Sequence, residues 1–126
     1  MVVVDASAIV DALLGAEDVL HVLERDSIHA PVSVDAEVLH AIRRQWFAKL
    51  IKDLNALGAV ESFRAMDITR HPVQPLVERM WALRRNITAY DAGYVALAES
   101  LHVPLLTRDW RLAHASGHAA AIEYIA

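Results

Sequence analysis

The sequence predicts an α/β fold with a central parallel sheet and helices on both of its faces, and three observations support this prediction. Residues 2–4 are consecutive valines, and such a run is typical of a strand buried on both faces of a parallel sheet. Short apolar runs of this kind alternate with longer stretches that have helical spacing. The length of 126 residues suits one domain, so residues 1–126 are expected to form a single domain.

Composition excludes several classes of protein. Sixteen acidic residues against twelve Lys and Arg give a net charge of −4, which excludes a globally basic nucleic-acid binder. The absence of cysteine excludes disulfides and thiolate metal sites, and it fits a cytoplasmic location. No apolar run approaches the roughly 18 residues of a membrane span, and Asp5 interrupts the first run too early for a signal peptide. Apolar residues make up 56%, so we expect a partner to cover some apolar surface, although a rich core alone would also explain this excess.

The first part of the chain is expected to contain three helices and a second strand. Gly15 separates the first two helical stretches, and Pro31 ends the short strand. Ser33 is expected to cap the third helix, whose inner side would include Trp46. The predicted helices cover residues 6–14, 17–25 and 34–46, and the strand covers residues 27–30.

The second part of the chain is less regular. Residues 47–66 have helical spacing, but Gly58 is expected to break the helix and to leave a second short one. Thr88 is expected to cap a helix over residues 89–101, which is apolar almost all round and should therefore be central. The remaining helices are predicted at 76–85 and 110–115, and the remaining strands at 67–69, 104–107 and 121–125.

Four of the acidic residues have positions that set them apart. Asp5 directly follows the first strand and Asp109 follows the strand 104–107, so both should lie at the carboxyl edge of a parallel sheet. Glu37 and Asp91 lie in the first turns of their helices, and helices in this topology begin near the same edge. We therefore expect the four carboxylates to converge.

Each of these acids also has a purely local interpretation. Thr88 and Asp91 match a capping box, Asp5 and Asp109 can cap the helices after them, and the helix dipole favours Glu37. Four like charges at a partly buried site, however, are destabilising unless a cation neutralises them. Oxygen ligands indicate Mg²⁺ or Mn²⁺, and such ions commonly serve phosphodiester hydrolysis.

Two hydroxyl groups are predicted to support the site. Ser7 and Thr107 each stand two residues from an aspartate of the group, in the patterns D-x-S and T-x-D. Their hydroxyls could orient the carboxylates or a metal-bound water. The alternative interpretation is a helix cap for Ser7 and an ordinary strand-end hydroxyl for Thr107.

The chain resembles PIN-domain ribonucleases, and most closely the VapC toxins of bacterial toxin–antitoxin pairs, in the motifs VVVDASAIV, DAEVLHAIRR, LRRNITAYDAGYVALAE and PLLTRDWRLA. The resemblance implies a three-layer α/β/α fold that hydrolyses RNA with Mg²⁺ or Mn²⁺. Matched by motif, the catalytic and metal-binding quartet is Asp5, Glu37, Asp91 and Asp109, supported by Ser7 and Thr107. The resemblance also implies a homodimer and an inhibitory antitoxin, which alone would bind operator DNA. Residues 47–66 match the family pattern only loosely.

The negative net charge requires a local source of positive charge for RNA binding. Six arginines flank the predicted site in sequence, at positions 43, 44, 84, 85, 108 and 111. We expect Arg44, Arg84 and Arg108 to bind substrate phosphates. The alternative interpretation is that these arginines are solvated or paired with nearby acids.

Three other functions fit the sequence less well. A phospho-receiver domain needs a lysine after a late strand, and the only lysines here are Lys49 and Lys52. A phosphatase of the haloacid-dehalogenase type usually has a second acid two residues after its aspartate nucleophile, where this chain has Ser7. A non-catalytic binding module with a PIN fold is the remaining alternative to a ribonuclease.

Overall fold

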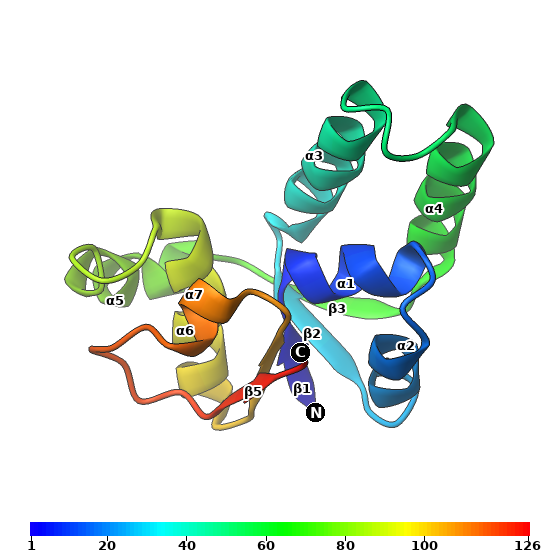
Figure 1. Cartoon of the computed structure of the whole chain (residues 1–126). Helices are drawn as coiled ribbons and strands as arrows, with labels where there is room; N and C mark the ends of the chain where they lie inside the picture. Colours follow the sequence, from blue (N-terminus) through cyan, green and yellow to red (C-terminus); the bar gives the residue numbers. More distant parts are fainter.

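Five strands form one parallel sheet in the order β3-β2-β1-β4-β5 in the computed structural model, which describes residues 1–126 (Figure 1). The strands are β1 (Val2–Val4), β2 (Ile28–Pro31), β3 (Ile68–His71), β4 (Leu105–Thr107) and β5 (Ile122–Tyr124). The central strand is β1, and Val3 and Val4 have no exposed surface. The predicted α/β class is confirmed, because both faces of the valine strand are covered.

Helices cover both faces of the sheet, as predicted (Figure 1). One face carries α1 (Ala6–Leu13), α2 (Glu17–Leu23), α3 (Val34–Phe47) and α4 (Asp53–Ala65). The other face carries α5 (Val77–Ala82), which follows the 3₁₀ turn η1 (Gln74–Leu76), together with α6 (Ala89–Leu101) and α7 (Trp110–Ala113). No helix is both long and apolar enough to cross a bilayer.

The central position of α6 is also confirmed. Its seven residues 92–98 are all buried, and the helix packs against β1 and β2. The Thr88 side chain accepts a hydrogen bond from the Asp91 backbone N–H at 3.2 Å, which is the expected N-cap. This cap fixes the start of α6 at the edge of the sheet where β1 ends.

The predictions for residues 47–66 were partly wrong. A single helix, α4, runs through Gly58, where an added Cβ would meet nothing within 4 Å. Glycine in a helix costs only about 1 kcal/mol relative to alanine, and burial of Ala59 and Phe63 against the core offsets this. Leu54 is 81% exposed, so the apolar spacing in this region does not mark a buried face.

Two further details differ from the predictions. Trp46 is 42% exposed rather than part of the inner side of α3. The predicted helix over residues 76–85 is shorter, because α5 ends at Ala82 and turns follow it. Both stretches carry apolar side chains on the exposed side as well, such as Phe47 and Trp81, so spacing alone does not identify the buried face.

Candidate active site at the carboxyl edge of the sheet

Asp5 is held by three hydrogen bonds at the carboxyl end of β1. Its Oδ1 accepts from the Ser7 hydroxyl at 2.7 Å and from the Ala8 N–H at 3.0 Å. Its Oδ2 accepts from the Thr107 hydroxyl at 2.5 Å. Asp5 is only 4% exposed. It therefore caps α1, as one interpretation held, and is also fixed by both predicted hydroxyl groups.

Thr107 links two neighbouring strand ends. Its Oγ1 donates to Asp5 and accepts from the Asp109 N–H at 2.9 Å. The Asp109 carboxylate in turn accepts from the Arg111 N–H at 2.9 Å and caps α7. Ser7 completes this arrangement, because its Oγ accepts from the Arg108 N–H at 3.2 Å. The two acids that follow β1 and β4 are thus joined through one buried hydroxyl.

Glu37 is positioned by Ser33, which the sequence predicts only as a helix cap, and by Tyr94, for which the sequence predicts no role at the site. Its Oε2 accepts from the Ser33 hydroxyl at 2.8 Å and from the Tyr94 hydroxyl at 3.3 Å. Ser33 stands at the predicted start of α3 but makes no side-chain cap, because its hydroxyl turns to Glu37. Helical spacing could have identified both residues, because residues three or four positions apart lie on the same face of a helix. Ser33 precedes Glu37 by four residues, and Tyr94 follows Asp91 by three.

The carboxylates carry negative charge that no basic side chain neutralises. Burial raises the pKa of Asp5 from 3.8 to about 6, and the nearby Asp91 adds to this effect. Burial also raises the pKa of Glu37 and of Asp91, and repulsion between the acids contributes to both. No Lys, Arg or His lies within salt-bridge distance of any of the four acids. The site therefore favours a cation or protons.

The donor set suits a divalent cation. All four side chains offer carboxylate oxygens, which are the ligands that Mg²⁺ and Mn²⁺ prefer. No three of the acidic or imidazole side chains are already gathered at the spacing of metal ligands. Binding of an ion at this edge would therefore require the carboxylates to move together, which is easiest for the less constrained Asp91.

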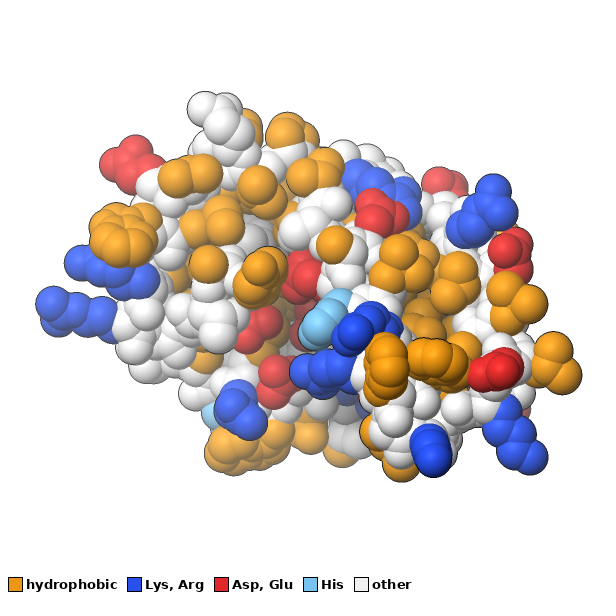
Figure 2. Space-filling view, turned by 90° about the horizontal axis from the view of Figure 1, so that it is seen from above, with side chains coloured by type: hydrophobic (Ala, Val, Ile, Leu, Met, Phe, Trp, Pro, Cys, Tyr) orange, Lys and Arg blue, Asp and Glu red, His pale blue; other side chains and the backbone are white.

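A cavity of about 600 Å³ opens beside these acids. Figure 2 looks onto the molecule from above the view of Figure 1 and shows acidic side chains in a hollow near its centre, next to a histidine and basic side chains. The cavity lies between α3 and the start of α6. Its polar lining consists of Ser33, Glu37, His40, Arg44, Tyr90 and Asp91.

Only one of the three predicted substrate-binding arginines lines this cavity. Arg44 does so directly. Arg84 instead packs over the ring of Trp81, 4.5 Å from its centroid. Arg108 pairs with Asp11 at 2.9 Å and with Asp18 at 3.2 Å, as the alternative interpretation allowed. Sequence proximity to the acids did not distinguish these three environments.

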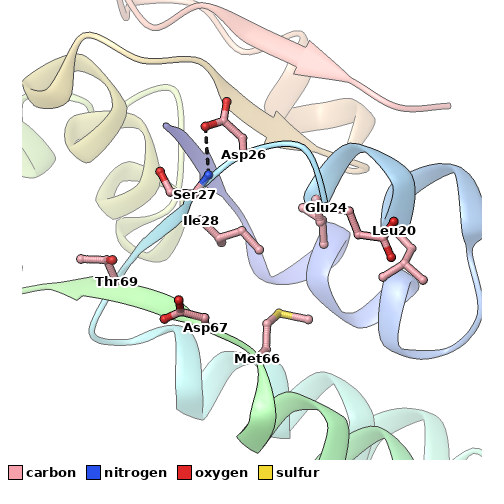
Figure 3. A pocket seen from close by; sticks show the side chains of 9 residues that line it. Leu20, Glu24, Asp26, Ser27, Ile28, Met66, Asp67 and Thr69 are labelled. Carbon is pink, nitrogen blue, oxygen red and sulfur yellow. Dashed lines mark hydrogen bonds between the residues drawn. The ribbon is translucent and has the colours of Figure 1, made fainter.

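A second cavity, of about 300 Å³, lies at the opposite edge of the sheet (Figure 3). Its apolar lining comes from Leu20 and Leu23 on α2, Ile28 on β2 and Met66 at the end of α4. Asp26 also lines it and accepts hydrogen bonds from the Ser27 N–H and the N-terminal amine. Because this cavity adjoins the amino ends of β2 and β3, it is separate from the four carboxylates.

Comparisons with known proteins agree with the arrangement of the fold. The PIN domain family model matches residues 2–117. Ribonuclease VapC12 of Mycobacterium tuberculosis is 42% identical over 129 residues that cover both chains fully. Ribonuclease VapC1 of the same organism is 46% identical over 98% of this chain and 96% of its own.

Two solved structures share the fold. A crystal structure of PAE2754 from Pyrobaculum aerophilum has a TM-score of 0.64 and 25% identity, covering 89% of this chain and 83% of its own. A toxin-antitoxin complex from Klebsiella pneumoniae has a TM-score of 0.65 and 17% identity, covering 90% and 91%. The chain therefore belongs to the PIN-domain family, and VapC ribonucleases are its relatives within that family.

Proposed function

We propose that this chain is a metal-dependent endoribonuclease that acts as the toxin of a toxin–antitoxin pair. The observation that carries the proposal is the group of four carboxylates at one sheet edge, where the pKa of Asp5, Glu37 and Asp91 is raised and no basic side chain neutralises them. The names of its relatives, such as Ribonuclease VapC12, support RNA as the substrate.

Asp5, Glu37, Asp91 and Asp109 would hold Mg²⁺ or Mn²⁺. Such an ion, when bound, supplies Lewis-acid activation of water and charge stabilisation for phosphodiester hydrolysis. Ser7 and Thr107 orient both oxygens of Asp5, and Tyr94 and Ser33 hold one oxygen of Glu37. This leaves the other Glu37 oxygen without a hydrogen-bond donor in the chain, and the Thr88 side chain is the only one that assists the Asp91 carboxylate.

The proposal includes protein partners. A cognate antitoxin would inhibit the enzyme and would alone contact operator DNA, and the chain would form a homodimer. Exposed apolar side chains support a protein partner, since contiguous patches of this kind mark interaction surfaces. They cluster at the junction of α3 and α4, in Trp46, Phe47, Leu50, Leu54 and Leu57.

The decisive experiment is an RNA cleavage assay with the purified chain free of antitoxin. We expect cleavage in Mg²⁺ or Mn²⁺, no cleavage in EDTA, and loss of cleavage in Asp5→Ala and Asp91→Asn. Equal cleavage by the wild type and both variants would refute the assignment of the carboxylates. RNA binding without any cleavage would favour the non-catalytic binding module.

A further inference from the structure

We propose that Tyr90 and Arg44 form a subsite for one unpaired nucleotide beside the carboxylates, with the base stacked on Tyr90 and its phosphate on Arg44. This inference rests on the proposed ribonuclease function and names the part of the substrate that the cavity would hold. It assigns a role to Tyr90 and says which phosphate the expected contact of Arg44 would hold. Neither side chain contributes to the core.

Tyr90 is an exposed aromatic residue at the rim of the active site. It directly precedes Asp91, lines the same cavity as Asp91 and Glu37, and is 67% exposed. No aromatic ring stacks on it, no guanidinium lies over it, and its hydroxyl makes no hydrogen bond within the chain. One face of the ring is therefore free for a base, and stacking of this kind tolerates any base because every base has a π face.

Arg44 supplies a positive charge on the opposite wall. It lies on α3, seven residues and hence about two turns after Glu37. Arg70, Arg79 and Arg108 are all paired with carboxylates, whereas Arg44 makes no ion pair and stacks on no ring. A solvated guanidinium in a cavity wall is suited to a phosphate oxygen.

The size and position of the cavity favour an unpaired nucleotide. Its volume of about 600 Å³ lies within the range of ordinary small-ligand sites. A base in a duplex is stacked on both sides and paired at its edge, so it must leave the helix before it can stack on Tyr90. His40, one turn from both Glu37 and Arg44, lines the same wall and offers ring nitrogens to the edge of such a base.

Binding of a fluorescein-labelled RNA tests the subsite independently of catalysis. The full chain in EDTA is titrated against an unpaired ten-nucleotide RNA and against the same sequence within a duplex, with anisotropy as the signal. We expect Tyr90→Leu to weaken binding of the unpaired RNA by about ten-fold or more, and Tyr90→Phe to stay within about two-fold of wild type. The matched control is Trp81→Leu, an equally exposed aromatic outside this cavity, which should bind as wild type does.

The contribution of Arg44 is measured by salt dependence. If Arg44 contacts one phosphate, Arg44→Gln should reduce the slope of log K against log salt by about 0.7 for a single strand. Because both side chains are exposed, the variants should keep the wild-type melting temperature, which shows that any lost affinity does not come from unfolding.

A cleavage assay in Mn²⁺ with the same proteins separates this inference from the proposed function. If Tyr90→Leu and Arg44→Gln bind the unpaired RNA as tightly as the wild type does, the subsite is overturned, even if the wild type cleaves RNA. Selective loss of binding in these variants would support the subsite, even if the wild type cleaves nothing. Equal affinity of the wild type for unpaired and duplex RNA, or no binding at all, would also overturn it.

Discussion

Replacing Asp5 by asparagine should stabilise the metal-free protein at neutral pH. Asp5 is almost fully buried, and its carboxylate has three hydrogen-bond donors but no positive partner. Asparagine has nearly the same shape and carries no charge. Its amide can still accept from the Ala8 N–H and can donate to the Thr107 hydroxyl oxygen.

The pH dependence of this effect follows from the raised pKa. Below pH 3.8 the carboxyl is protonated in the folded and the unfolded chain, so its ionisation has no influence on stability. Between pH 3.8 and about 6 the unfolded chain has lost the proton while the folded chain still holds it, so the folded state loses stability as the pH rises. Above that range both states are ionised and the loss stays constant. At about 1.4 kcal/mol per pKa unit, the loss reaches about 3 kcal/mol near pH 8.

Urea unfolding followed by tryptophan fluorescence in EDTA measures this difference. The free energy of unfolding of Asp5→Asn minus that of the wild type should grow by about 2.4 kcal/mol between pH 4 and pH 8. The altered hydrogen bonds of the asparagine change the free energy of unfolding by the same amount at every pH. The increase of the difference with pH therefore reports the ionisation of Asp5 alone. Asp67→Asn, at an exposed aspartate, is the matched control and should follow the wild type within about 0.5 kcal/mol.

A constant difference between Asp5→Asn and the wild type would refute this reasoning. It would mean that Asp5 ionises as easily in the folded chain as in the unfolded one. A difference that shrinks as the pH rises would be a stronger contradiction, since it would require a positive partner for the Asp5 carboxylate.

Four further predictions concern metal, positioning and pH. Millimolar Mn²⁺ should raise the melting temperature of the wild type but not that of Asp5→Asn, because an ion that binds only the native state stabilises it; an unchanged wild-type melting temperature would contradict the metal site. Glu37→Gln should weaken the response to Mn²⁺ in the same assay without unfolding the protein at 25 °C by circular dichroism. Tyr94→Phe removes one of two donors to Glu37 and should lower RNA cleavage about ten-fold with little change in KM, whereas an unaltered kcat would mean that Ser33 alone positions Glu37. The pKa of His29 is lowered because the side chain is buried and faces His71. The unfolded chain therefore binds protons more readily, and the free energy of unfolding should fall as the pH drops below about 6.5. In urea titrations, His29→Gln should make this dependence on pH weaker.

Strong local signals made most of the fold predictable from the sequence. The valine run and the apolar run of α6 each specify a buried environment, because their side chains are stable only inside the core. Thr88 instead specifies a helix start, because its hydroxyl caps α6. Residues 47–66 carry no such constraint. Their leucines have helical spacing, yet Leu54 faces solvent, and apolar spacing is the same for a buried face and for a surface kept for a partner.

The strand ends and helix starts that carry the four acids could also be predicted, because topology alone brings them to one edge. The side chains around them were harder to identify. Tyr94 lies within the buried run of α6 and would pass for an ordinary core residue. Among the arginines, Arg108 directly precedes Asp109, whereas Arg44 stands seven residues after Glu37. Nearness in sequence therefore favours Arg108, but Arg108 pairs with Asp11 and Asp18, and Arg44 is the one that lines the cavity.

The bond from Thr107 to Asp5 has a consequence for when the protein becomes active. It joins residues 102 positions apart, across the pairing of β1 with β4. A ribosome must therefore release the chain well past Asp109 before the carboxylate group can assemble, so partly synthesised chains carry Asp5 and Glu37 without a working site.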